Sequence, residues 1–496
     1  MKKHIALVII ALATLATGFT AKADRLVILH TNDTHSQIDP MDNGLGGVLR
    51  RKVLIDSVRA AEPNVMLIDA GDAVQGTLFF NLYKGEVEHR VMNHLGYDLA
   101  ILGNHDFDNG VDLLADNLSH DSITWITTNY DLAASPLAPR FVPYALKQFG
   151  DRTIAFIGIN LQPKGMISEG NYDGVEFLDI LKAANSTAWH LKHNEKVDMV
   201  IAITHIGYDG QPAPHDIDLA ANSEDIDIII GGHTHTTLVD GHDLTRIPNS
   251  AGKRVLVTQT GSRGVNLGEI TIDLDNLSAT SRLIPVDSRL DTTAPDPTLV
   301  SLIEPYRQGI DSIMNVKIAR SDVELNEPRL LNLFSDIVLE RGRQLADNVD
   351  LALLNKGGIR RTLPKGNITE GMIMTTLPFN NRVTVLDVSG ADLLEALNIM
   401  AARDDQGIAG NVKVITEGSP AHVAELTING EPVIPEKIYR VATIDYLANG
   451  GDYMVPLTRA PVIATSPNVV YADVIDYMRS LGKKKLNPSS TPRFTD

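Results

Sequence analysis

Cysteine is absent from this chain of 496 residues. The absence excludes disulfide bonds, lipid-modified cysteines and thiolate metal ligands, so any metal site must be built from oxygen and nitrogen donors. Such donors suit zinc, manganese or other divalent first-row ions, not copper(I) or an iron–sulfur cluster. Without disulfides, an exported chain depends on its hydrophobic cores and bound metals for stability.

Positive charge is scarce. The chain has 44 Lys and Arg against 62 Asp and Glu, which gives a formal net charge of −18. A protein this acidic repels nucleic-acid backbones and anionic membrane surfaces, so we expect neither as a partner. Small phosphates complexed with metal ions remain suitable, because they can meet local positive charge from the ions and a few arginines.

Long apolar runs are also missing, except at the N-terminus. There, basic residues at 1–4 are followed by the apolar run 5–16 and by Ala21-Lys22-Ala23. This order predicts a secretory signal peptide, residues 1–23, cleaved after Ala23. The alternative is a membrane anchor, but the run is shorter than the roughly 20 residues that a bilayer requires. We therefore expect an exported, periplasmic or secreted protein with no stable membrane association; the oligomeric state stays open.

The length predicts two domains, because one hydrophobic core rarely serves so long a chain. The best boundary is the polar, proline-rich stretch 291–297. We predict a first domain over residues 24–291, a linker and connector helix over 292–316 with its helix at 298–313, and a second domain over 317–496. In the first domain, helices are expected at 47–61 and 111–117 and a closing hairpin over 268–287.

Six short apolar runs in the first domain predict strands. They read RLVILH, NVMLID, DLAIL, MVIAIT, DIDIII and RVLVTQ, and continuous apolar runs of this length are typical of strands buried on both faces. Five of them end in polar residues that could bind a ligand. Because α/β sheets bind ligands beyond the carboxyl ends of their strands, we expect these residues to converge.

The converging side chains are a mixture of carboxylates, one amide and imidazoles: Asp33, His35, Asp72, Asn104, His105, His205, His233 and His235. Eight donors exceed the needs of one ion, whereas two ions about 3.5 to 4 Å apart could share a bridging carboxylate, as in many phosphatases. Asp72 is the natural bridge. The alternative is that each histidine is a capping or core residue, which is the more common role of a single histidine after a strand. We expect this role for His30, which lies inside a strand and should be packed in the core. Nine further histidines, including His89 and His215, have no ligand-like context and are expected to be surface or incidental residues.

The series HTNDTH, DAGD, GNHDFD, THIG and GGHTH resembles the N-terminal metallophosphoesterase domain of the bacterial and animal 5'-nucleotidase family. The resemblance implies an α/β fold, a four-layer α/β/β/α sandwich that binds two divalent ions. It implies Asp33, His35, Asp72 and His235 at one ion, and Asp72, Asn104, His205 and His233 at the other. His105 and Asp108 match the catalytic dyad. Several members have Gln in place of His235, and both residues can bind a metal.

Three loops carry the chemistry of the second domain, at 355–360, 377–381 and 445–452. Their glycine pairs allow a close approach to a ligand, and their aromatic rings offer faces on which a base can stack. The loops resemble the family's C-terminal nucleotide-specificity domain, an α+β fold. The resemblance implies that Phe379 and Tyr446 clamp the base, that Asp452 accepts hydrogen bonds from the ribose, and that Asn355, Arg360 and Asn381 lie near the nucleoside or phosphate. Loop packing is the alternative for the rings, and a solvated pair is the alternative for Arg360 and Arg361.

One segment departs from the family. Many members have an arginine before a Gly-Asn-Leu helix start, whereas this chain reads ELNEPRLLNLF. The glycine is missing, and Arg329 is the only cation nearby. Whether Arg329 takes over phosphate binding is open from the sequence.

Together these features predict metal-dependent hydrolysis of nucleoside 5'-monophosphates to nucleoside and phosphate by a water activated by two metal ions. His105 would stabilise the transition state or protonate the leaving oxygen, with Asp108 fixing its ring. The alternatives are a related phosphoesterase acting on UDP-sugars, 2',3'-cyclic nucleotides or 3'-nucleotides, and, from another class, a non-catalytic exported nucleotide-binding protein. Because metal ligands and base-binding loops lie in different domains, we expect the domains to close on the substrate.

Overall fold

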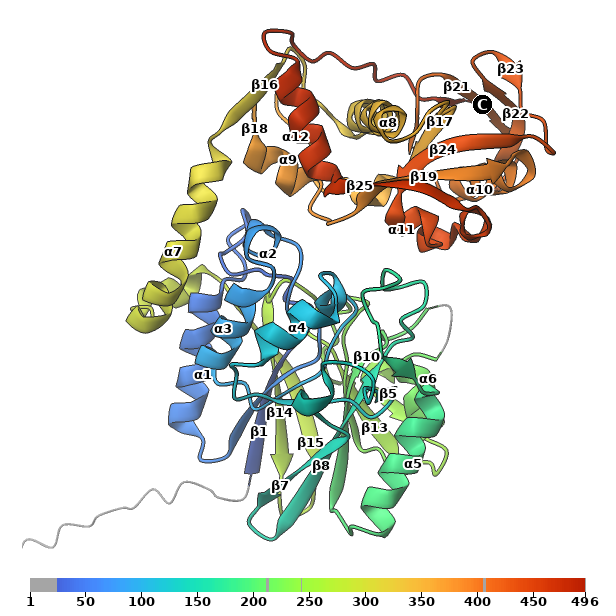
Figure 1. The fold of residues 1–496 in the computed structure, drawn as a ribbon. Helices are drawn as coiled ribbons and strands as arrows, with labels where there is room; N and C mark the ends of the chain where they lie inside the picture. The colour runs from blue at the N-terminus through green and yellow to red at the C-terminus, as the bar shows by residue number, and fades with distance from the viewer. Residues whose placement is uncertain (1–24, 211–213, 242, 405–406, 496) are drawn as a thin grey trace, which may run out of the picture.

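The computed structural model describes residues 25–210, 214–241, 243–404 and 407–495 (Figure 1). The predicted signal peptide, residues 1–23, lies outside these ranges, as do His4 and His242. None of the helices in the described ranges has the length and apolar character needed to cross a lipid bilayer.

All six apolar runs form strands, but they are divided between two sheets. A seven-stranded sheet has the order β15-β14-β1-β2-β3-β4-β6, and a six-stranded sheet has the order β12-β13-β11-β10-β8-β7. Within each sheet the three strands formed by these runs are parallel. The first sheet contains β1 (Arg25–Thr31), β2 (Val65–Asp69), β3 (Leu99–Ala100), β4 (Thr124–Ile126), β6 (Phe141–Val142), β14 (Asn266–Asp273) and β15 (Ala279–Pro285). The second contains β7 (Tyr144–Phe149), β8 (Arg152–Asn160), β10 (Met199–His205), β11 (Ile228–Ile230), β12 (Arg246–Pro248) and β13 (Arg254–Thr258).

The two sheets pack face to face and are covered by helices on their outer sides. Alternate residues of β1 show this: Leu26 and Ile28 belong to the core between the sheets, while Val27 and Leu29 belong to the core under the helices. Helices α1 (Val48–Ala61), α3 (Glu86–Leu95) and α4 (Val111–Leu118) cover the first sheet, and α5 (Ile180–His193) and α6 (Asp216–Ala221) cover the second (Figure 1). The expected α/β/β/α sandwich is confirmed, because strands apolar on both faces need cover on both.

The remaining predicted elements of this half are observed with small shifts in their bounds. The helices expected at 47–61 and 111–117 are α1 and α4, and the hairpin is β14 and β15, which pair antiparallel. Beyond the six strands, the two helices and the hairpin, the elements of this half were not predicted individually; they include α2 (Leu78–Tyr83), β5 (Tyr130–Asp131) and β9 (Glu176–Phe177).

A long helix connects the two halves. Helix α7 (Pro297–Met314) begins after Asp296, whose carboxylate accepts hydrogen bonds from the N–H groups of Thr298 and Leu299 at 2.8 and 3.2 Å. Such a cap satisfies donors that an α-helix leaves unpaired at its start. Figure 1 shows α7 running from the sandwich to the second half.

The second half is an α+β body with one core. Its five-stranded sheet has the order β20-β17-β24-β19-β25, and smaller sheets have the orders β23-β22-β21-β26 and β16-β18. The strands are β16 (Lys317–Ser321), β17 (Leu351–Leu354), β18 (Gly366–Thr369), β19 (Arg382–Ser389), β20 (Gly407–Ile408), β21 (Val412–Glu417), β22 (His422–Ile428), β23 (Glu431–Pro432), β24 (Ile438–Ile444), β25 (Val462–Val469) and β26 (Phe494–Thr495). The helices are α8 (Glu327–Leu345), α9 (Glu370–Thr376), α10 (Gly390–Arg403), α11 (Asp445–Ala448) and α12 (Val470–Ser480).

The two halves touch beside the ends of the sandwich strands. Lys84 Nζ donates to Asn380 Oδ1 over 3.2 Å, and Asn380 Nδ2 donates to Asn109 Oδ1 over 3.0 Å. Leu78 on α2 packs into the core of the second half. The loop that carries Asn380 therefore lies against the loop that follows Asp108.

Candidate metal centre

Residues from both sheets meet at the carboxyl ends of their strands. Two groups of side chains each bring their ligand atoms within 4.8 Å of one another: Asp33, His35 and His235 in the first group, and Asp72, His205 and His233 in the second. His205 is the last residue of β10, and the other five residues lie in segments that follow β1, β2 and β11. Convergence therefore depends on packing one sheet on the other, because neither sheet holds a complete set.

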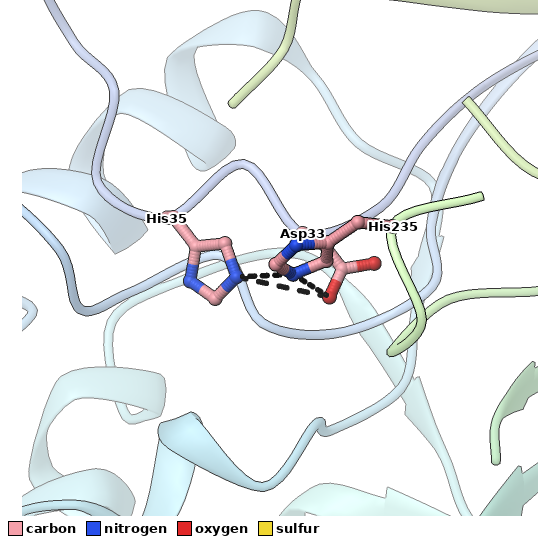
Figure 2. Close-up of side chains that lie close together, drawn as sticks. All are labelled: Asp33, His35 and His235. Carbon is pink, nitrogen blue, oxygen red and sulfur yellow. Dashed lines mark hydrogen bonds and ion pairs between the residues drawn. The ribbon is translucent and has the colours of Figure 1, made fainter. Parts of the chain in front are cut away.

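The first group is drawn in Figure 2. The Nε2 atoms of His35 and His235 are 2.9 Å apart, and Asp33 Oδ1 lies 3.4 Å from His235 Nε2 and 3.8 Å from His35 Nε2. Asp33 Oδ1 is buried and accepts no hydrogen bond within the described residues. Two ring nitrogens directed at each other and at a carboxylate oxygen without a donor fit a divalent cation with nitrogen and oxygen ligands.

The second group is oriented by a hydrogen bond behind it. His205 Nδ1 lies 2.7 Å from the carbonyl oxygen of Ala70, so this nitrogen is the donor, and Nε2 is the nitrogen that a metal could bind once the ring is neutral. His205 Nε2 faces Asp72 Oδ2 at 3.2 Å. His233 Nδ1 lies 3.0 Å from Asn104 Oδ1, which brings the expected amide ligand to the same group.

The backbone at the candidate ligands is strained. Five of the residues in these groups lie in the left-handed region, with φ of 49° at Asp33, 47° at His35, 56° at Asp72, 77° at His233 and 55° at His235. Each such residue costs on the order of 1 to 3 kcal/mol, and this kind of strain collects at functional sites. Neighbouring loops hold the conformation: the Asp33 N–H donates to the Gly71 carbonyl over 2.9 Å, and the His35 N–H donates to the Asp72 carbonyl over 3.0 Å.

One buried carboxyl group that the sequence analysis left unassigned supports the site. Asp106 Oδ2 accepts the N–H groups of Gly103 and Asp72 at 2.7 and 3.1 Å. Burial, and to a smaller extent the charge of Asp72, raise the pKa of Asp106 to about 8. Gly103 is needed because a Cβ there would lie 2.1 Å from Asp72 Oδ1. Asp106 stands inside GNHDFD, but nothing in that motif shows which acid faces inward.

The expected dyad lies beside both groups. His105 Nδ1 is 3.1 Å from Asp108 Oδ2, and the two side chains are 27% and 26% exposed. The His105 ring lies 5.5 Å from that of His35, between ring centroids. Burial lowers the pKa of His105, but the carboxylates of Asp108 and Asp72 outweigh it and raise the value to about 9. A protonated ring in this position can donate a proton to a leaving group.

Protonation of the candidate ligands is uneven. Burial lowers the pKa of His35 and of His233 to about 4. At His205 burial also acts to lower the pKa, but Asp72 and Asp33 together raise it to about 10. A proton on His205 thus offsets the two buried carboxylates. A metal ion binds only the neutral ring, so a bound cation would displace that proton. Metal affinity should therefore decrease as the pH decreases.

The six residues expected at the nucleotide lie in the three expected segments, but the segment 445–452 is not a loop throughout, because Tyr446 lies on the short helix α11. Asn355 Nδ2 donates to Asp452 Oδ2 over 2.6 Å, and the Tyr446 hydroxyl donates to Asp452 Oδ1 over 3.2 Å. The Arg360 guanidinium lies 5.0 Å from the centre of the Phe379 ring. A small, mainly apolar cavity is lined by Leu354, Asn355, Gly358, Leu377, Phe379, Asn381, Ile444 and Val470.

Arg329 is engaged elsewhere. Its guanidinium donates to the carbonyl oxygen of Pro488, and the neighbouring Asn332 Nδ2 donates to the carbonyls of Ser489 and Thr491 at 2.9 and 3.0 Å. The start of α8 is thus tied to the C-terminal segment. Within the described chain, the side-chain hydrogen bond of Arg329 goes to this segment and not to the residues expected at the nucleotide.

Two of the histidines expected to be surface or incidental residues are buried, so a surface position was wrong for them. His89 is 2% exposed, because α3 turns it toward the Trp125 ring at 5.8 Å. His215 is 9% exposed, because it caps α6 and its Nδ1 donates to the Ile206 carbonyl over 2.6 Å. His30 is fully buried, as predicted.

Comparison with known proteins agrees with this geometry. The family model for calcineurin-like phosphoesterases matches residues 26–237, and the model for the C-terminal domain of 5'-nucleotidases matches residues 310–458. The chain belongs to the 5'-nucleotidase family. It is an enzyme of the phosphoric monoester hydrolase type whose family uses two divalent metal ions.

Individual relatives extend over nearly the whole chain. The 5'-nucleotidase of Vibrio cholerae is 28% identical over 508 residues, which cover 92% of this chain and 91% of the relative. The crystal structure of a 5'-nucleotidase precursor from Thermus thermophilus, also 28% identical, covers 95% of this chain and 99% of its own, with a TM-score of 0.77. The trifunctional nucleotide phosphoesterase protein of Bacillus subtilis is 28% identical over 92% of this chain, but the chain spans only 34% of that relative's length.

Proposed function

We propose that this 5'-nucleotidase family member hydrolyses nucleoside 5'-monophosphates to nucleoside and phosphate. The observation that carries the proposal is the meeting of two ligand groups with a histidine–aspartate pair at one edge of the sandwich. The ligands are Asp33, His35, Asp72, Asn104, His205, His233 and His235, with Asp72 shared. A nucleotide-binding protein without catalysis would need no proton donor beside its metals.

The orphaned Asp33 oxygen and the facing imidazoles fit two divalent cations, zinc, manganese or a similar ion. Such cations, when bound, supply Lewis acidity that draws charge from the phosphoryl oxygens and makes a water molecule more acidic. The protein would hold the cations in fixed positions. The backbone hydrogen bonds between the loops that carry the candidate ligands support this role.

His105 is proposed as the group that completes the reaction. A water oxygen forms a bond to phosphorus, the bond from phosphorus to the ester oxygen breaks, and the proton on His105 passes to that leaving oxygen. Asp108, 3.1 Å from Nδ1, orients the ring and keeps its pKa high enough for it to be protonated at neutral pH.

The second half is proposed to bind the nucleoside. Phe379 and Tyr446 offer faces to the base, Asp452 can accept hydrogen bonds from ribose hydroxyls, and Asn355, Arg360 and Asn381 lie near the nucleoside or phosphate. Because Asn380 bonds Asn109 beside Asp108, the base-binding loop and the dyad are neighbours in this conformation. Domain closure through α7 would bring substrate against both.

A substrate panel tests the proposal. Phosphate release from AMP, UDP-glucose, 2',3'-cyclic AMP and 3'-AMP is measured with manganese or zinc, before and after chelation. We expect AMP to be hydrolysed best and chelation to stop the reaction. AMP as the poorest of the four would refute the nucleotidase assignment, and the absence of any metal-dependent turnover would favour a binding protein.

We further propose that the protein is exported, with residues 1–23 removed after Ala23, and that its domains span 24–291 and 317–496 with a connector over 292–316. The support is the order of basic, apolar and small residues at the N-terminus and the position of α7. N-terminal sequencing of protein from the periplasm or medium should begin at Asp24. A mature protein that still begins at Met1 would contradict export by this signal.

A further inference from the structure

Gln259 ends RVLVTQ, the one apolar run of the six that does not lead into a candidate metal ligand. The run forms β13, which ends at Thr258, and the Gln259 side chain is 0% exposed. A fully buried amide is costly unless both its donor and its acceptor are satisfied. Its partners lie in the turn of residues 231–236, which follows β11 and is called the ligand turn.

Both ends of the Gln259 amide bond the backbone of the ligand turn. Nε2 donates to the Gly232 carbonyl over 2.9 Å, and Oε1 accepts the N–H group of Thr236. His233 and His235 lie between these two contacts. Only one orientation of the amide satisfies both, because its nitrogen must face a carbonyl and its oxygen must face an N–H group. The amide therefore spans the segment that carries both histidines.

The ligand turn is held in a conformation that its residues do not favour by themselves. The Gly231 N–H donates to the Thr258 carbonyl over 2.8 Å, which attaches the start of the turn to β13. His233 and His235 both lie in the left-handed region, with φ of 77° and 55°. Such residues persist only where the surrounding structure determines their conformation. The Gln259 side chain supplies a restraint on both sides of them.

The start of the ligand turn has no room for side chains. A Cβ at Gly231 would overlap Asp216 Oδ2 and would lie 3.4 Å from Gln259 Nε2. A Cβ at Gly232 would lie 2.8 Å from the carbonyl oxygen of Ala70. Asp216 is itself fully buried. The glycine backbone is therefore enclosed by other groups, and the Gln259 amide acts on a turn whose start is already fixed.

The two histidines of the ligand turn belong to different ligand groups. His235 is a member of the first group, and His233 is a member of the second. One turn thus supplies one ligand to each group, and its shape helps to set the distance between the groups. Two ions that share a bridging carboxylate lie about 3.5 to 4 Å apart. A restraint on this turn would act on both ions at once.

We propose that Gln259 is a positioning residue that holds His233 and His235 at the spacing that a pair of divalent cations requires. It acts through its contacts to the backbone on either side of the two histidines. This inference rests on the two cations of the proposed function, but it does not depend on which ester is hydrolysed.

The test measures the binding of manganese(II) and of zinc(II) to the metal-free protein by equilibrium dialysis. Gln259→Met keeps most of the side-chain volume and removes the amide. We expect both ions to bind about ten- to hundredfold more weakly in this variant, the usual effect of losing a group that orients metal ligands. Loss of one ligand histidine should instead empty only one group.

Asn249 provides a matched control at the other end of β13. Its side chain is 6% exposed, its Nδ2 donates to the Glu224 carbonyl over 3.1 Å, and its Oδ1 accepts the Lys253 N–H at 2.8 Å. Asn249→Leu therefore removes a buried amide that also holds a backbone turn, but a turn without candidate ligands. We expect both variants to lower the denaturant concentration at which the metal-free protein unfolds, and only Gln259→Met to weaken metal binding.

Gln259→Glu tests the hydrogen-bond donor itself. A protonated carboxyl group can donate to the Gly232 carbonyl and accept the Thr236 N–H, whereas a carboxylate places a second acceptor against that carbonyl. Burial raises the pKa of such a carboxyl group. The ratio of the metal affinity of this variant to that of wild type should therefore fall as the pH rises. Deprotonation of the ligand histidines affects both proteins and cancels in the ratio.

Electron paramagnetic resonance of the manganese-loaded proteins reports the spacing of the ions, because two nearby manganese(II) ions couple magnetically. At saturating manganese, we expect a coupled spectrum in wild type and in Asn249→Leu. The coupling should be altered in Gln259→Met, since the two histidines are no longer held at one spacing. An unchanged coupling in that variant would contradict the proposed role.

Other results would also overturn the inference. These are equal metal affinities in wild type and Gln259→Met, equal weakening in Gln259→Met and Asn249→Leu, or a ratio for Gln259→Glu that does not change with pH. If wild type binds two ions but hydrolyses no nucleotide, the proposed function fails and the metal affinities still test Gln259. If wild type binds neither manganese nor zinc, the inference and the proposed metal centre fail together.

Discussion

His35 and His235 face each other with 2.9 Å between their Nε2 atoms, although 200 positions separate them in the chain. The two nitrogens attract each other only if one of them carries a proton and donates a hydrogen bond to the other. Asp33 Oδ1 lies near both nitrogens and has no hydrogen-bond partner in the described residues. A divalent cation resolves this arrangement, because it can accept all three lone pairs at once.

Replacing one of these ligands should therefore remove one ion and leave the other. We expect His235→Ala to reduce the metal content, measured by elemental analysis after loading and dialysis, from two ions per chain to one. His120→Ala, an exposed histidine of the same half, should retain both ions. Unchanged metal content in His235→Ala would exclude His235 as a ligand.

Loss of the proposed proton donor should slow the reaction without emptying the site. We expect His105→Asn to reduce kcat by about two to four orders of magnitude, the range that general acid catalysis contributes. Metal content should be unchanged, since His105 belongs to neither ligand group. Near wild-type turnover in this variant would remove the dyad from the mechanism.

The pH dependence should follow Asp108. The protonated form of His105 is the active one, so activity is retained below its pKa and lost above it. Asp108 and Asp72 raise that pKa to about 9. Asp108→Asn removes one of these charges, so the alkaline limb of the kcat profile should move to lower pH. An alkaline limb at the same pH in both proteins would show that it does not report His105.

Asp106 should act as a neutral acceptor that shapes the Asp72 loop. Its pKa of about 8 keeps the carboxyl group protonated at pH 7, so Asp106→Asn, which keeps the acceptor oxygen, should cost little stability. Asp106→Ala leaves the N–H groups of Gly103 and Asp72 unpaired and should cost about 1 to 3 kcal/mol for each buried donor. Chemical denaturation of the metal-free proteins measures both. Equal losses in the two variants would show that the volume of the side chain matters more than its oxygen.

The connection between sequence and fold is strongest where apolar runs are continuous. Runs such as MVIAIT and DIDIII form β10 and β11. These strands carry apolar side chains on both faces, so both faces are buried. The short β3, with Leu99 and Ala100, was also predicted, from a run that ends in Gly103-Asn104. Helix α2 was not predicted, since its six residues LFFNLY lack a helical pattern; tertiary packing buries Leu78 in the core of the second half and Phe79 in the core of the first.

By itself, the sequence determined the strand cores, the donor types and the residues that turn away from each strand end, because these depend on local patterns of apolar and polar side chains. The tertiary structure decided the rest. Packing of two separate sheets brings Asp33 and His235 together, the turn after β3 buries Asp106, and contact between the halves places Asn380 against Asn109. These are relations between distant segments, and only three-dimensional packing fixes their distances and charges.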